Sequence, residues 1–479
     1  MSKAWLTLTV LLAGCATQVP QALPPRLMPR TFIGPAPSGA QVWPDASWWR
    51  GFGDAQLATL VEQAQADNRD LAVAAARVMQ AEAQSTIQRS ALFPQISGQS
   101  NYQASGCKGL ACQQYPSGKD FGLQLSASYE LDFWGLARDN LRAANEQLKA
   151  ARFAQQSVAL TVTANVATQY LTVLSLRRRI AIADEYIAAI NSILDVIKLR
   201  VKAGATSHLD LAQEQAQIEA VQAQLPSLEI LEKEALYSLA ILLGRPPEGF
   251  DVTPDELDAV LAPAVGAGLP SDLLLRRPDV ALAEASLASV HANVDAARAA
   301  FLPQISLIGS GGFLSGTIGT LLQVSNSGYT YGAGLLQAIF DGGKLIGEKR
   351  VAEATQKQYI AAYQNAALNA YADVESALIE VANTGRAESH LRSLITAAQE
   401  AFEISQLQYR QGAADLIIVL QAQQTLFSAE DQLAQTVLAN RLASIHLYEA
   451  LGGGWVEKPE ERTQFAASVS VQAQYADPR

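Results

Sequence analysis

An internal duplication constrains the fold of this chain more than any other feature. When the sequence is shifted against itself by about 209 positions, FPQIS at 93–97 aligns with LPQIS at 302–306. Further matches follow in the same order: Asp132 with Asp341, Gly204 with Gly412 one position out of register, and Leu243-Gly244 with Leu451-Gly452. Because several matches occur in one order, we interpret the chain as two copies of one structural unit.

The sequence pattern of each copy predicts one helix, then a pair of strands, then very long helices. Residues 136–203 contain neither glycine nor proline, and as a helix they would span roughly 100 Å. Residues 205–243 are interrupted only by Pro226, and their counterpart 413–451 is uninterrupted. Small residues lie around the whole circumference of the helices, which favours a wall of packed helices, although an ordinary long coiled coil also fits this pattern.

The strands exclude most coiled-coil interpretations. From 121 to 131, apolar residues alternate with Gly, Gln, Ser and Glu, and the apolar set includes an aromatic residue near each end. This alternation is typical of a barrel strand with one face toward lipid and the other toward water. We predict strand pairs at about 95–131 and about 304–340.

These strands predict a shared membrane barrel. After residue 15 no stretch offers the roughly 18 uninterrupted apolar residues of a transmembrane helix, so strands must make any crossing. Four strands cannot close a barrel, and an open edge is unstable in lipid. The barrel is therefore expected to be shared between chains, and an aqueous lumen favours three or more subunits.

The N-terminus predicts export and lipidation. Lys3, an apolar run at 4–12 and LAGC at 12–15 indicate a signal peptide over 1–14, with Cys15 as the acylated first residue of the mature chain. The alternative is an ordinary signal peptide with an incidental cysteine. Ala16, in place of an aspartate, favours sorting to the outer membrane. Residues 15–45 would then form a lipidated, extended leader.

The other two cysteines and the net charge bear on whether the chain has a disulfide, binds metal or binds nucleic acid. In an exported chain, Cys107 and Cys112 suggest a small loop disulfide; a metal site would need further ligands, and none adjoin them. The net charge of −11 and the dispersed cations argue against nucleic acid binding. The four histidines are isolated and no nucleophile or phosphate-binding motif occurs, so we expect no enzyme, no metal and no cofactor besides the lipid on Cys15.

Several motifs together give the chain a resemblance to a known family. They are WWRGF at 48–52, LRRPD at 275–279, IFDGG at 339–343 and ALGGGW at 450–455, with the lipobox and the two PQIS segments. The chain resembles the TolC/OprM outer-membrane factors, and in particular their NodT-like lipoprotein branch. The resemblance covers nearly the whole mature chain.

The resemblance implies an α+β membrane protein. Three chains would form one twelve-stranded barrel in outer-membrane lipid, continued by a long helical barrel in the periplasm. The two repeats would span 46–260 and 261–455, and residues 456–479 would be a tail that joins a belt around the tunnel. The expected partners are two further copies of the chain, a periplasmic adaptor and an inner-membrane transporter, commonly of the RND type.

The far ends of the long helices are the candidate functional site. Gly204 and Gly412 predict the tight turns there. In the family this tip carries acidic rings that narrow the pore and grooves for the adaptor. Lys202 and Arg410, just before the glycines, are expected to clamp neighbouring helices, to face the adaptor, or to be solvated helix ends.

The acidic residues of the tip match the family pattern only in the first copy. Asp210 matches a family aspartate, whereas the second-copy positions are Ile418 and Gln421, with Asp415 in a nearby register. Three copies each of Asp210 and Asp415 would bias a narrow pore toward cations. His208, beside them, is a candidate pH-sensitive contact or an ordinary surface histidine.

The sequence therefore predicts a passive outer-membrane exit channel of a tripartite efflux pump for drugs or other small toxic solutes. A structural lipoprotein coiled coil is the alternative from another class, and the alternating strands count against it. An exit duct for secreted proteins or for metal ions remains open within transport. Of the three methionines, Met1 and Met28 lie in the leader, so no cluster suggests copper.

Overall fold

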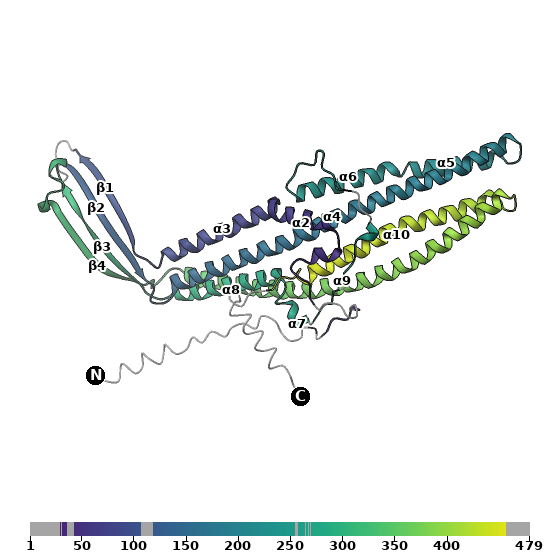
Figure 1. The fold of residues 1–479 in the computed structure, drawn as a ribbon. Helices are drawn as coiled ribbons and strands as arrows, with labels where there is room; N and C mark the ends of the chain where they lie inside the picture. Colours follow the sequence, from purple (N-terminus) through teal and green to yellow (C-terminus); the bar gives the residue numbers. More distant parts are fainter. Residues whose placement is uncertain are drawn as a thin grey trace, which may run out of the picture.

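The fold is an elongated α+β structure with strands at one end and helix tips at the other (Figure 1). The computed structural model describes residue 29 and residues 31–35, 43–106, 118–253, 257–263, 265–266, 268 and 270–456. Cys15, Cys107, Cys112, most of the leader and the tail at 457–479 lie outside the described residues. Predictions about them are therefore not examined by the structure.

The order of elements repeats along the chain. The first copy contains η2 (Trp48–Phe52), α2 (Ala55–Asp67), α3 (Arg69–Ser90), β1 (Gln95–Ser105), β2 (Gly118–Leu131), α4 (Leu136–Lys202), α5 (His208–Gln222) and α6 (Leu225–Leu242). After η4 (Leu257–Ala259), the second copy contains α7 (Pro270–Leu273), α8 (Pro278–Ala299), β3 (Gln304–Ser315), η5 (Ile318–Thr320), η6 (Val324–Asn326), β4 (Ser327–Leu336), α9 (Lys344–Arg410) and α10 (Leu416–Ala450). The predicted duplication, with four strands per chain and long helices, is confirmed.

Two details differ from the sequence prediction. The run 205–243 forms two helices, because the chain breaks around residues 223–224 and Pro226 lies in the first turn of α6. The last strand ends at Leu336 instead of near residue 340. Leu336 pairs with Gln304, and the next position on β3 would be Pro303, which has no N–H to donate to the ladder.

The four strands form one antiparallel sheet in the order β1-β2-β3-β4. Tyr102 lies opposite Phe121, which in turn lies opposite Ser315. Large apolar side chains of the sheet remain uncovered by the described chain, among them Leu125, Tyr329 and Tyr331. An exposed apolar surface on a sheet indicates contact with lipid or with another chain.

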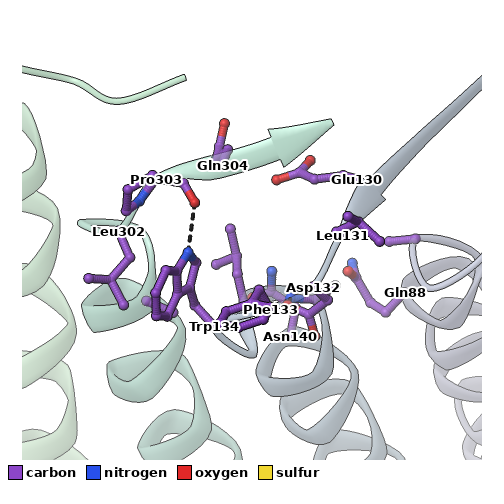
Figure 2. Close-up of a pocket in the computed structure, with 14 residues that line it drawn as sticks. Gln88, Glu130, Leu131, Asp132, Phe133, Trp134, Asn140, Leu302, Pro303 and Gln304 are labelled. Atoms are coloured by element: carbon purple, nitrogen blue, oxygen red, sulfur yellow. Dashed lines mark hydrogen bonds between the residues drawn. The ribbon is translucent and has the colours of Figure 1, made fainter. Parts of the chain in front are cut away.

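The same capping device joins strands to helices in both copies. The carboxylate of Asp132 accepts the backbone N–H groups of Ala137 and Arg138, at 3.0 Å each, at the start of α4. Asp341 accepts N–H groups at the start of α9 in the same way. In the first copy, Trp134 also donates its Nε1–H to the Pro303 carbonyl at 2.7 Å, which ties the two copies together beside a small pocket (Figure 2).

A second repeated joint packs the C-terminal end of a helix, α6 or α10, against the chain just before α3 or α8. Gly244, after α6, has a φ of +69°, and a Cβ there would lie 2.4 Å from the carbonyl oxygen of Asp67. Gly452, after α10, is tighter still, because a Cβ would lie 1.7 Å from the carbonyl oxygen of Arg276. The side chain of Asn68 donates to the Leu242 carbonyl at the first joint. This close approach explains why Leu-Gly recurs at the end of both copies.

The helices form a wall around a central core. On the strand side of the joints, α4 packs between α3 and α8, and α8 also contacts α9; on the other side, α4 packs against α5, α6 and α10, and α10 against α9 (Figure 1). The largest buried cluster lies where these halves meet, and there Trp48 stacks on Tyr448 with ring centroids 5.0 Å apart. Among the described helices, none combines the length and apolarity needed to span a membrane.

Candidate functional site at the helical tip

Two matching turns close the tip. Gly204 and Gly412 have φ values of +67° and +75°, and in each turn the next residue donates its N–H to a carbonyl five residues earlier. This is the glycine-terminated helix end that the sequence predicted. A Cβ on either glycine would meet nothing within 4 Å, so glycine is required here for backbone conformation alone.

The two acidic residues of the tip have different surroundings. Asp210 belongs to the cap of α5: its carboxylate accepts the Thr206 hydroxyl and the Ser207 N–H, and its own N–H donates to the Ser207 hydroxyl at 3.3 Å. Asp415 is exposed at the start of α10 and makes no capping bond with its side chain. The carboxylate of Asp415 is therefore better placed than that of Asp210 to act on ions in solution.

The remaining tip residues that the sequence singled out are also on the surface. Ile418 and Gln421 are exposed on the first turns of α10. Lys202 and Arg410 are exposed, and no ion pair forms at either one in the described part of the chain. The structure thus places all four side chains on the surface of the tip.

A different arginine joins the two helix pairs. Arg200 donates from one guanidinium nitrogen to the carbonyls of Tyr409 and Arg410, at 3.2 and 3.0 Å. Its guanidinium carbon also lies 4.6 Å from the centre of the Tyr409 ring. Because α4 and α9 belong to different copies, this Arg200 clasp holds the two helix pairs together at the tip. The sequence does not single out Arg200, since one arginine near a helix end carries no distinct signal.

A second set of contacts ties α4, α5 and α10 further from the turns. Gln217 donates to the Tyr186 hydroxyl at 2.9 Å and also bonds to Gln424. The Tyr186 ring stacks on Phe427 with centroids 4.3 Å apart. These contacts define the seam between the two pairs.

A buried carboxyl lies within this seam. Glu214 on α5 has no exposed surface, and neither carboxyl oxygen has a hydrogen-bond partner. Burial alone raises the pKa of Glu214 to about 7. The sequence did carry a signal: Leu211, Ile218 and Val221 follow a coiled-coil spacing in which position 214 should also be apolar.

This architecture defines a class of protein. A sheet with exposed apolar side chains, capped directly into a wall of 67-residue helices with a clasped tip, is that of a channel subunit whose tunnel extends beyond the membrane. A family model described as "Outer membrane efflux protein" matches residues 60–245 and 269–453. The chain belongs to this family, and it is an outer-membrane channel component of efflux systems, not an enzyme.

Individual relatives align with this chain over almost their whole lengths. The chain is 36% identical to the pyoverdine export outer membrane protein OpmQ of Pseudomonas putida over 94% of this chain and 97% of that protein. It is 30% identical to the probable efflux pump outer membrane protein TtgC of the same species, over 98% and 99%. Its structure superposes on the crystal structure of CusC with a TM-score of 0.82 at 27% identity, covering 92% of this chain and all of that one.

Proposed function

We propose that three copies of the chain form a closed channel. The support is that both edges of the structure are unpartnered: within the described residues, β1 and β4 each pair on one side only. Apolar side chains are also exposed on the outer helices, including Tyr237 and Ile241 on α6 and Ile379 and Leu394 on α9. Joining one edge to the opposite edge of a second copy pairs the strands and buries these side chains, and repeating the operation closes a ring.

The trimer would act as the passive exit duct of a tripartite pump. A periplasmic adaptor and an inner-membrane transporter of the RND type would deliver drugs or other small toxic solutes to the tip. The tip would open when the adaptor engages, by separation of the α4–α5 pair from the α9–α10 pair. The single observation that carries this proposal is the Arg200 clasp, because it joins those two pairs by a few hydrogen bonds at the tip, one of them exposed.

Other parts of the chain have supporting roles in this proposal. Cys15 would carry the lipid that anchors the leader in the outer membrane, and the tail after residue 456 would join the belt around the tunnel. Cys107 and Cys112 would form a disulfide in the loop between β1 and β2. The adaptor would contact the tip around Gly204 and Gly412, with their neighbours Lys202 and Arg410.

Two measurements test this proposal. Native mass spectrometry of the detergent-purified protein should give a mass of three acylated chains, and a monomer or dimer would contradict the trimer. Deleting the gene should raise the intracellular accumulation of a fluorescent pump substrate, and the wild-type gene should restore efflux. Normal efflux in the deletion strain, with no other family member expressed, would contradict the pump assignment.

The relatives favour a second candidate solute class. Two OpmQ proteins that share 36–38% identity with this chain are named for pyoverdine export. An iron-chelating secreted metabolite is therefore a specific alternative to drugs. Measuring siderophore in the medium of the deletion strain under iron limitation separates the two, because only the metabolite exporter would leave the medium depleted.

A further inference from the structure

Glu214 is the most isolated titratable group in the helical tip. Its side chain is fully buried on α5, and both carboxyl oxygens lack a hydrogen-bond partner. On α10, Gln423 is 1% exposed, and its amide oxygen and nitrogen also lack partners. Two such polar groups are unfavourable in a packed helical seam, where an apolar side chain would normally lie.

Both residues lie at the level where the two helix pairs meet. α5 and α10 both begin at the tip, and Gln217 on α5 contacts Gln424 on α10. Glu214 is three residues from Gln217, and Gln423 is adjacent to Gln424, so each lies within one helical turn of that contact. The apolar residues that flank Glu214 on the same face of α5 pack in clusters with residues of both α4 and α10. Separation of α5 from α10 would therefore remove part of the cover over Glu214 and admit water.

Few other ionisable groups act on Glu214. On α4, burial raises the pKa of Tyr186, and the charge of Glu214 adds a smaller rise. The charged α4 pair Asp195 and Lys198 is exposed and bonded to itself. On its own helix, Asp210 is engaged in the cap, and α10 has no charged residue from Leu416 to residue 429. No neighbouring cation thus stabilises an ionised Glu214 in the packed tip.

We propose that Glu214 is a proton-sensitive latch: at acidic pH its carboxyl group is neutral while the seam is packed, and it ionises when α5 and α10 separate. The O–H bond breaks on opening and the proton passes to water, at most one per protomer. This inference rests on the proposed function, since it concerns the opening of the same tip.

The direction of the pH effect follows from the two environments. Burial raises the pKa of Glu214 to about 7 in the packed seam, and exposure returns it toward its ordinary value of 4.5. The packed state therefore binds the proton more tightly, so acid favours closure and a rise in pH favours opening. For these values the opening equilibrium rises roughly tenfold or more per protomer between pH 5 and pH 7.

The test is single-channel recording of the purified full-length protein in planar bilayers between pH 5 and pH 8. Wild type should open more often as the pH rises, whereas Glu214→Gln, which is uncharged at every pH, should lose most of this rise. Comparing the two proteins at each pH cancels the effects of His208 and Asp210, which both retain. Glu219→Gln is the matched control, because Glu219 is exposed on the same helix and should leave the pH dependence unchanged.

Hydrogen–deuterium exchange provides a second readout. Relative to Glu214→Gln at the same pH, protection of the α5 and α10 peptides in wild type should fall as the pH rises. An unchanged pH profile in Glu214→Gln by both methods, with pores still forming, would overturn the latch and leave the channel intact. A protein that forms no pores in any variant would instead contradict the proposed function.

Discussion

Replacement of Arg200 by alanine should loosen the tip. The substitution removes two hydrogen bonds from a guanidinium to backbone carbonyls and a stacking contact on Tyr409. Because Arg200 is only half-buried, we take about 1 kcal/mol for each hydrogen bond, which is the usual value for uncharged partners and below the range for charged ones. Stacking of an exposed guanidinium adds about 0.5 kcal/mol. The total of about 2.5 kcal/mol per protomer corresponds to roughly a sixtyfold shift toward the separated state.

The assay is the open probability of single channels in planar bilayers at low applied voltage. Arg200→Ala should open far more often than wild type. Arg410→Ala is the matched control, because its exposed side chain makes no ion pair among the described residues while its carbonyl still accepts from Arg200. Equal effects of the two substitutions, or no effect of Arg200→Ala, would refute the view that this clasp holds the helix pairs together.

Two further predictions concern the glycines and acids. Gly452→Ala should lower the stability of the folded protein by at least about 3 kcal/mol, since its Cβ would overlap the Arg276 carbonyl. Gly412→Ala should lose only about 1 kcal/mol, for its left-handed backbone alone. Equal losses of stability in thermal unfolding in detergent would contradict a tight joint at Gly452, because both glycines have positive φ. Asp415→Asn should reduce the preference of open channels for cations. Asp210→Asn should mainly destabilise α5, by up to about 1 kcal/mol, because it removes a negative charge from the first turn of that helix. Equal reversal potentials of the two variants in a salt gradient would contradict this division.

Much of the fold was predictable because it depends on repeated, local patterns. The uninterrupted run after residue 136 gave α4 almost to the residue, and the alternation at 121–131 gave the core of β2. The early end of β4 was not predicted, because it depends on the N–H that Pro303 lacks on the neighbouring strand. Pairing partners of this kind become known only when the sheet register is known.

The positions of the two tip turns could be predicted from the sequence, whereas the contacts between the turns could not. Glycines with positive φ leave a clear sequence signal, and Gly204 and Gly412 do mark the turns. The clasp joins residues about two hundred positions apart, and no pattern in either copy reveals that Arg200 faces the opposite turn. Lys202 and Arg410 were candidate clamps because they lie just before the glycines, but in the structure both residues are exposed to solvent.

The conductance of the purified protein in planar bilayers tests the central claim most directly. Wild type should give small, infrequent, cation-selective openings. Asp210→Asn combined with Asp415→Asn should lose selectivity, and Arg200→Ala should open far more often. A trimer that forms no pores even with the Arg200 clasp removed would contradict the channel and support a structural role for this protein.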